Sequence, residues 1–361
     1  MAKRINKIQE FLDEKDIDAL LIKSKTVKKW MNTMTGSGCQ VLITKEHGYL
    51  IVDGRYITEA KEKEHDLEII LHNPHLTGRN YLGTVEEILK KENCKTLGVE
   101  AYQVLVKEYH EIEKLGIEVL LLDQEIAHLR IVKEDEEIEA MKKSIAITDE
   151  IYQKVIEHIH VGMSEYEISA LVQYYSIASG AQQMSFDTIV ATGERTALPH
   201  GRPTSRKVKA HEPIMIDFGI QYQNYQSDMT RMCFIGEPDP KIKEIYDVVL
   251  KAQLAGLSAI KAGAKGKDVD KAARDVIEAA GYGEYFNHGL GHGLGIGEDG
   301  EGPTLNSKSE TVLQEHMMSC EPGVYVPGVG GVRIEDDVVI IDGVGVPLNK
   351  TTKDYIILED K

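Results

Sequence analysis

The sequence lacks clustered cysteines, long apolar runs and any excess of proline or glycine. Its four cysteines lie far apart and form no CxxC pair, so we expect reduced thiols rather than a disulfide framework. No run of about eighteen apolar residues is present, so no membrane-spanning helix is predicted. With 10 Pro and 32 Gly in 361 residues, the composition also excludes a fibrous or disordered chain. A globular protein is therefore expected.

Positive charge is also scarce. The chain has 42 Lys and Arg against 59 Asp and Glu, which gives a formal net charge of −17. This balance disfavours nucleic acid or an anionic membrane as a partner. A solvated acidic surface is the simplest cause, although carboxylates that bind cations would contribute to the same excess. The first residues are basic but continue as a charged amphipathic helix rather than an apolar signal segment, so we expect a cytoplasmic protein.

The length and the apolar pattern predict two domains, residues 1–128 and 129–361. In the first, strands alternating with helices predict an α/β layer. The second is expected to begin with a long helix at 134–160, and Ser164 and Glu167 form a capping box for the next helix. After the long helix the chain reads as helix, strand and helix, and then as glycine-rich strands to the end. The expected elements of the first domain are strands 19–22, 41–44, 49–52, 68–71, 96–99 and 119–122 and helices 5–15, 56–63 and 85–91.

Two predicted strands of the second domain, 213–220 and 225–232, each contain an aspartate within an apolar run. Aspartate is depleted in strands, and burying its charge is costly unless something pairs with it. With the connecting loop centred on residues 222–223, we expect Asp217 and Asp228 directly opposite each other, with Cβ atoms about 4.5–5.5 Å apart. Two carboxylates that close repel each other unless a cation or a proton lies between them. The alternative is that one pairs with a base such as Arg231 and the other caps a turn.

Three further residues extend this candidate site. Glycine alternates with larger residues over 287–297, and His292 lies between two of these glycines, so its ring is free to bind a ligand. Glu321 precedes a Pro-Gly turn. Glu335 lies in the predicted strand 331–341, on the face that Arg333 and Asp337 share by strand periodicity, although Glu335 and Arg333 could also form a plain ion pair.

Four carboxylates and one imidazole are a plausible ligand set for two divalent metal ions. Hard oxygen donors with one nitrogen favour Mn²⁺-like or Zn²⁺-like ions. A bridged metal pair activates water and polarises a carbonyl group, which is the chemistry of amide hydrolysis. The set consists of Asp217, Asp228, His292, Glu321 and Glu335.

The segments around these residues resemble the pita-bread metallopeptidases, specifically the aminopeptidase P / Xaa-Pro dipeptidase (prolidase) branch. The likeness covers essentially the whole chain, because the first third is similar to the creatinase-like domain of this branch. It implies an α/β creatinase-like N-terminal domain and an α+β pita-bread catalytic domain. The matching catalytic segments, in the order of the family, are 216–219, 227–231, 291–295, 321–325 and 332–337.

The resemblance implies a role for each ligand. Asp217 would chelate one ion, Asp228 and Glu335 would bridge both, and His292 and Glu321 would complete the shell of the other. The family commonly uses two Mn²⁺ ions, with Co²⁺ or Zn²⁺ as substitutes. A hydroxide that bridges the two ions would attack the carbonyl group before a proline, while Glu321 shuttles a proton to the leaving nitrogen.

The resemblance also names residues beside the metals. His200 matches the family histidine that contacts the substrate and the tetrahedral intermediate, and Arg333 would hold Glu335 or the substrate. Proline lacks an N–H and has a fixed ring, so a pocket can select it by shape. The expected partners are small peptides with proline at the second position, and a homodimer is expected by analogy.

One position departs from the family pattern. Its second active-site histidine falls here on Gly300, or on Asp299 if the gap is placed differently, and His288 matches a different family histidine. Loss of such a donor typically costs on the order of 10²–10³-fold in rate. The alternative to a peptidase is therefore a catalytically impaired or altered homologue that binds metal or a partner. A creatinase-like hydrolase of another C–N bond fits less well, because creatinases do not keep the metal ligands.

Overall fold

The computed structural model describes residues 2–63, 66–122, 124–297 and 301–359. The chain divides into two compact units, Met1–Arg130 and Ile131–Lys361, two residues later than the division expected from the sequence. Gly300 and Asp299 lie outside the described residues. Within the described residues, no helix is both long enough and apolar enough to cross a membrane.

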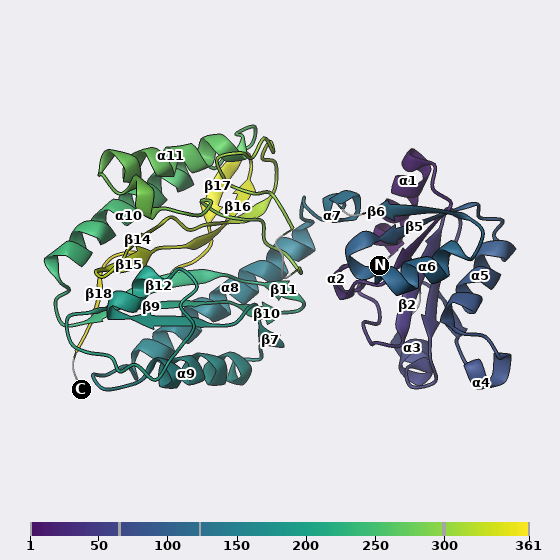
Figure 1. Cartoon of the computed structure of the whole chain (residues 1–361), viewed down its shortest axis with the longest axis horizontal. Helices are drawn as coiled ribbons and strands as arrows, with labels where there is room; N and C mark the ends of the chain where they lie inside the picture. Colours follow the sequence, from purple (N-terminus) through teal and green to yellow (C-terminus); the bar gives the residue numbers. More distant parts are fainter. Residues whose placement is uncertain (1, 64–65, 123, 298–300, 360–361) are drawn as a thin grey trace. The chain divides into compact units, whose positions relative to one another are not determined.

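The first unit is an α/β layer around a six-stranded mixed sheet (Figure 1). All six predicted strands are present, in the order β4-β3-β2-β1-β5-β6. Its strands are β1 (Ala19–Ile22), β2 (Cys39–Thr44), β3 (Gly48–Val52), β4 (Glu68–Leu71), β5 (Thr96–Glu100) and β6 (Glu118–Leu122). Its helices are α1 (Ala2–Lys15), α2 (Lys25–Trp30), α3 (Ile57–Lys63), α4 (Pro74–Thr77), α5 (Tyr81–Lys91), η1 (Ala101–Gln103), α6 (Val106–Glu113) and α7 (Gln124–His128).

The first half of the second unit contains the two helices that cover one face of its central sheet, together with most strands of that sheet. The long predicted helix is α8, which ends four residues before the expected limit, and the capping box of Ser164 and Glu167 opens α9 as predicted. These elements are α8 (Asp135–Ile156), α9 (Glu165–Ala178), β7 (Gln183–Met184), β8 (Ile189–Thr192), η2 (Gly193–Ala197), β9 (Pro213–Phe218), β10 (Ile220–Tyr222), β11 (Tyr225–Gln226) and β12 (Met229–Ile235).

The second half of this unit contains the two helices that cover the opposite face of the central sheet, together with the remaining strands. Its elements are α10 (Pro240–Ala259), α11 (Gly266–Ala279), η3 (Gly283–Tyr285), β13 (Met317–Cys320), β14 (Gly323–Val326), β15 (Gly330–Arg333), β16 (Asp336–Ile341), β17 (Val344–Pro347) and β18 (Ile356–Leu358). The sheet β18-β12-β9-β8 lies between α8 and α9 on one side and α10 and α11 on the other (Figure 1).

The central strands are apolar on both faces because both faces are buried. Ile214 and Ile216 of β9 pack in the same cluster as residues of α8 and α9. Met215, which points the other way, packs with residues of α10 and α11. Asp217 in this strand is only 6% exposed, so neighbouring groups decide whether its carboxyl group is protonated. This is the α+β pita-bread architecture that the resemblance predicted.

The predicted pairing of the two aspartates is wrong, although both lie on the same face. Asp217 is opposite Thr230 in the β9–β12 ladder. The hairpin turns at Gln223 and Asn224, both with positive φ, rather than one residue earlier. The ladder begins with Met229 opposite Phe218, so Asp228 lies just beyond the end of β9 rather than opposite Asp217. The two aspartates are therefore diagonal neighbours.

The predicted continuous strand over 331–341 is also wrong. β15 ends at Arg333 and pairs with β14, whereas β16 begins at Asp336 and pairs with β13. Between them, Glu335 donates its backbone N–H to the carbonyl oxygen of Thr230 at 3.2 Å. The break therefore places the Glu335 side chain next to the aspartate hairpin.

Candidate metal centre and active site

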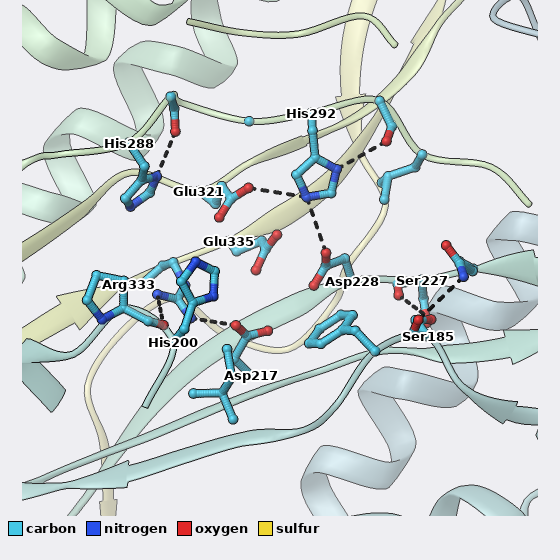
Figure 2. A pocket seen from close by; sticks show the side chains of 18 of the residues that line it. Ser185, His200, Asp217, Ser227, Asp228, His288, His292, Glu321, Arg333 and Glu335 are labelled. Atoms are coloured by element: carbon cyan, nitrogen blue, oxygen red, sulfur yellow. Dashed lines mark hydrogen bonds and ion pairs between the residues drawn. The ribbon is translucent and has the colours of Figure 1, made fainter. Parts of the chain in front are cut away.

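The second unit contains a cavity of about 520 Å³ into which the predicted site residues point. Figure 2 shows them converging from β9, from the loop before β12, from the glycine-rich loop and from the ends of β13 and β15. The residues that line it include Asp217, Asp228, His292, Glu321, Glu335, His200, His288 and Arg333. The chain therefore brings together residues that are more than 100 positions apart in the sequence.

His292 lies between two of the acids. Its Nε2 is 3.5 Å from Oδ2 of Asp228 and 3.4 Å from Oε1 of Glu321. Its Nδ1 is 3.1 Å from the carbonyl oxygen of Gly293 and donates to it, so Nε2 is the nitrogen that faces the carboxylates. Asp228, His292 and Glu335 each offer a ligand atom, and these atoms lie within 4.8 Å of one another.

Ser319 orients both sides of this contact. Its hydroxyl donates to Glu321 Oε1 at 3.0 Å and accepts the backbone N–H of His292 at 3.0 Å. The glycine-rich loop can approach the backbone of Gly302 closely because Gly293 has no side chain. A Cβ on Gly293 would lie 1.8 Å from the carbonyl oxygen of Gly302. Sequence reasoning missed this serine, because its partner His292 is 27 residues away in the chain.

The pKa values of three clustered acids are raised, as expected for carboxylates that share a buried site and repel one another unless a cation lies between them. The pKa of Asp217 is raised to about 7. Burial is the largest cause and the charges of Asp228 and Glu321 add to it, while Arg333 acts in the opposite direction. Burial and the neighbouring carboxylates raise the pKa of Glu335 well above its ordinary value, and burial raises that of Glu321. Burial lowers the pKa of His292, but Asp228 and Glu321 more than offset this and raise it to about 10.

Two unpaired carboxylate oxygens also indicate a cation site. Oδ1 of Asp217 and Oε1 of Glu335 are buried and have no hydrogen-bond partner among the described residues. Leaving buried carboxylate oxygens unpaired is costly. A divalent cation would satisfy them and would reverse the upward pKa shifts, so the residues fit a metal centre.

Arg333 connects the metal cluster, by which we mean the five candidate metal ligands, to the cavity wall. Its guanidinium donates to Asp217 Oδ2, to Thr230 Oγ1 at 2.9 Å, to the Tyr325 hydroxyl at 2.8 Å and to the Pro199 carbonyl at 3.1 Å. Thr230 in turn donates to Glu335 Oε2 at 2.7 Å. Arg333 therefore contacts Asp217 directly and reaches Glu335 through Thr230. Neither Thr230 nor Tyr325 was predicted as a site residue.

The two other histidines of the cavity differ. His288 donates from Nδ1 to the Gly289 carbonyl at 2.7 Å and accepts the Tyr325 hydroxyl at Nε2 at 2.9 Å. Burial lowers its pKa to about 4, so the ring is neutral. His200 is exposed, lines the cavity and has no ring hydrogen bond within the described residues. Of the two, His200 is the one whose nitrogens are available to a substrate.

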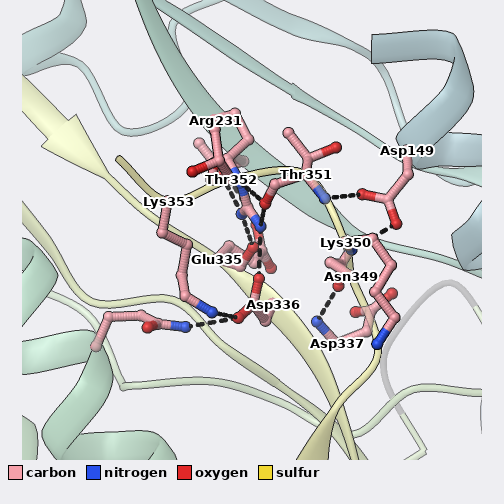
Figure 3. Close-up of polar contacts among 12 residues, drawn as sticks. Asp149, Arg231, Glu335, Asp336, Asp337, Asn349, Lys350, Thr351, Thr352 and Lys353 are labelled. Atoms are coloured by element: carbon pink, nitrogen blue, oxygen red, sulfur yellow. Dashed lines mark hydrogen bonds and ion pairs between the residues drawn. The ribbon is translucent and has the colours of Figure 1, made fainter. Parts of the chain in front are cut away.

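A buried ionic network supports Glu335 from behind (Figure 3). Arg231 donates to the backbone carbonyl of Glu335, to Asp336 Oδ1 at 2.6 Å and to the Thr351 carbonyl at 2.9 Å. Asp336 also accepts from Lys353 Nζ at 2.5 Å. Both Arg231 and Asp336 are almost fully buried. The network fixes the backbone at Glu335 and connects it to the last residues of the unit.

We expect Arg231→Met to destabilise the second unit strongly. Removing one partner of a buried ion pair typically costs about 3–5 kcal/mol. Asp336 would keep its contact with Lys353, but the buried carbonyl oxygens of Glu335 and Thr351 would also lose the Arg231 donor. Urea denaturation of the metal-free protein would measure the loss. Lys267→Met is the matched control, since it removes a basic side chain from an exposed pair with Glu310 and should leave the transition in place.

Comparison with known proteins agrees with this fold. Residues 4–132 match the creatinase/prolidase N-terminal domain, and residues 139–342 match metallopeptidase family M24. The fold and the site together define a metallopeptidase. The M24 match covers more than half of the chain, and the chain belongs to this family.

Individual relatives are similar along their whole length. An Xaa-Pro dipeptidase of Pyrococcus furiosus is 38% identical over 361 residues, which cover 99% of this chain and 100% of that protein. The solved Xaa-Pro dipeptidase from Bacillus anthracis is 35% identical, with a TM-score of 0.94 and 99% of each chain covered. The solved X-Pro aminopeptidase from Thermotoga maritima is also 35% identical, with a TM-score of 0.88 and coverage of 95% of this chain and 98% of that one.

Proposed function

We propose that this protein hydrolyses the peptide bond before proline in small peptides, as an Xaa-Pro dipeptidase or an Xaa-Pro aminopeptidase. The observation that carries the proposal is the convergence of four carboxylates and one imidazole in one cavity, with two buried carboxylate oxygens unpaired among the described residues. Similarity to both a dipeptidase and an aminopeptidase supports the reaction and keeps both substrate lengths open. A cytoplasmic location and a homodimer stay predictions.

Five residues would hold two divalent ions, which we propose to be Mn²⁺, with Co²⁺ or Zn²⁺ as substitutes. Asp217 would chelate one ion, Asp228 and Glu335 would bridge both, and His292 and Glu321 would complete the other shell. When bound, the ions would lower the pKa of water and polarise the substrate carbonyl group.

The chain's own groups would then handle charge and protons. Glu321 lines the cavity beside His292, and its Oε1 is the oxygen that contacts Ser319 and His292, so its other oxygen would take a proton from the attacking water and deliver it to the leaving nitrogen. That nitrogen has no hydrogen of its own in an Xaa-Pro bond. His200 would donate to the carbonyl oxygen as negative charge develops there. Arg333 would keep Asp217 in place.

Steady-state assays with an Xaa-Pro dipeptide and an Xaa-Pro tripeptide test the proposal. We expect Mn²⁺-dependent turnover that EDTA abolishes and added Mn²⁺ restores. Turnover of the dipeptide alone would indicate a dipeptidase, and release of the first residue from the tripeptide would indicate an aminopeptidase. An Xaa-Ala dipeptide is the matched control and should be a poor substrate.

The second candidate is an impaired or altered homologue that binds metal or a partner. It is favoured by Gly300, which occupies the position where the family pattern has a histidine. The two candidates differ in one measurable respect. A protein that retains metal after dialysis but turns over neither peptide would support the second and contradict the first.

A further inference from the structure

A second buried carboxylate lies outside the metal cluster, at the start of α9. The side chain of Glu165 is fully buried and accepts five hydrogen bonds. Thr192 donates its N–H and its hydroxyl, both at 2.9 Å, and Thr204 donates its N–H at 2.9 Å and its hydroxyl at 2.7 Å. The fifth donor is Nη1 of Arg195.

These donors flank His200 on both sides. Thr192 and Arg195 precede it, and Thr204 follows it. Arg195 also spans the segment, since its Nη2 donates to the Arg202 carbonyl at 2.8 Å. Glu165 and Arg195 therefore tie together the two ends of the segment that carries His200.

Residues 198–206 belong to no helix or strand, so hydrogen bonds to neighbouring segments hold them. Within the segment the backbone hydrogen bonds are turns, with Leu198 N–H donating to Arg195 and Gly201 N–H to Leu198, both at 3.0 Å. The N–H groups of Tyr166 and Glu165 donate to the carbonyls of Thr204 and Arg206, both at 3.1 Å, and Arg202 donates to the Asp187 carbonyl at 3.2 Å. The His200 ring makes no hydrogen bond within the described residues, so its position in the cavity depends on its backbone. The contact from Arg333 to the Pro199 carbonyl fixes that backbone from the side of the metal cluster.

We propose that Glu165 and Arg195 are positioning residues that hold His200 in the cavity. The inference rests on the proposed function, because His200 matters only if a substrate binds there. A fully buried carboxylate with five donors from three points of one segment fixes that segment's backbone geometry closely. Misplacing a substrate-contacting group by about 1 Å can cost on the order of 10²-fold in rate.

A double-mutant cycle between Arg195→Met and His200→Ala tests the coupling. We expect Arg195→Met to lower kcat for an Xaa-Pro dipeptide by about 10-fold to 100-fold while the metal content stays the same. In the His200→Ala background, the same change should cost less than about twofold, because a residue that acts through His200 has nothing left to position. Equal losses in both backgrounds would overturn the proposal.

Arg206→Met is the matched control in the same segment. The Arg206 side chain is about as exposed as that of Arg195; it pairs with Glu212 and donates to Thr192 Oγ1 at 2.6 Å but does not contact Glu165, so its removal leaves all five donors to Glu165 in place. We expect kcat to change by less than about twofold. A loss as large as that of Arg195→Met would mean that any damage to the segment suffices, and the specific role of Arg195 would be refuted.

Hydrogen exchange separates this inference from the proposed function. In Arg195→Met, amides of 198–204 should exchange faster than in the wild type, and those of β9 and β12 should not. Unchanged exchange over 198–204 would overturn the positioning role even if the enzyme is active. Failure of the wild type to cleave Xaa-Pro peptides would contradict the proposed function, and faster exchange would still support the role of Arg195 in holding the segment.

Discussion

Asp228→Ala will lose bound metal and with it more than about 100-fold of the peptidase activity, since even residues that only orient a metal ligand cost 10-fold to 100-fold. The physical reason is the position of Asp228 in the cluster. Its Oδ2 lies 3.5 Å from Nε2 of His292, and its charge contributes to raising the pKa of Asp217, Glu321 and Glu335. As the proposed bridging ligand, Asp228 would contact both ions, so its removal would weaken the binding of both. Metal analysis of the dialysed protein for Mn, Co and Zn is the measurement.

Asp187→Ala is the matched control for this prediction. Asp187 lines the same cavity, but its side chain is 82% exposed and pairs with Arg202 rather than with the cluster. This variant should hold up to two ions per chain, as we expect of the wild type. If Asp228→Ala keeps all of its metal, the bridging assignment is wrong.

The same substitution should not unfold the protein. In the metal-free state Asp228 repels the carboxylates of Asp217, Glu321, Glu335 and Asp337, and removing it relieves that repulsion. The change also removes the contact of Asp228 with His292, but His292 keeps its contact with Glu321. The metal-free variant should therefore melt at the same temperature as the metal-free wild type or higher. A lower melting temperature would mean that loss of metal reflects misfolding, and the two measurements together distinguish these causes.

The fold was predictable where apolar runs are long enough to mark an element. The strand around Asp217 is an example, because an acid in a run such as Pro213–Phe218 is conspicuous. The register was not predictable, since it depends on which two residues of the polar loop adopt positive φ. Gln223 and Asn224 do so, and nothing in the loop composition excludes the neighbouring pair. Short helices such as Lys25–Trp30 have too few turns to show a periodic pattern.

The ligand candidates were visible for a related reason, but their supports were not. Each acid of the cluster stands out against its local sequence, whereas Thr230 and Ser319 are ordinary residues in ordinary strands. Their roles depend on hydrogen bonds to residues distant in the chain, such as the contact of Thr230 with Glu335 at 2.7 Å. The break after Arg333 was hidden because its residues are all compatible with a continuous strand. The neighbours of a site residue thus come from the fold and not from the local pattern.

Gly300→His will raise the rate of Xaa-Pro hydrolysis, by up to about 100-fold if the wild type lacks a donor at this position. Gly300 lies outside the described residues, so this prediction rests on the resemblance, in which the matching position carries the second active-site histidine. Gly297, three residues earlier, lines the cavity, and its N–H and that of Ile296 each donate to Glu301 Oε1 at 3.1 Å. Glu301 is anchored in turn by Lys133 at 2.9 Å.

Two comparisons make this prediction decisive. Gly300→Ala changes the backbone freedom of the same position without adding a donor, so any gain specific to histidine must come from the imidazole. Metal content should be equal in the wild type and both variants, because the five candidate ligands are untouched. If the wild type is already fully active and Gly300→His abolishes turnover, the missing histidine is not what limits this protein, and another group of the cavity supplies that donor. If all three proteins bind metal and only Gly300→His turns over the peptide, the natural chain is a metal-binding homologue whose catalytic donor has been lost.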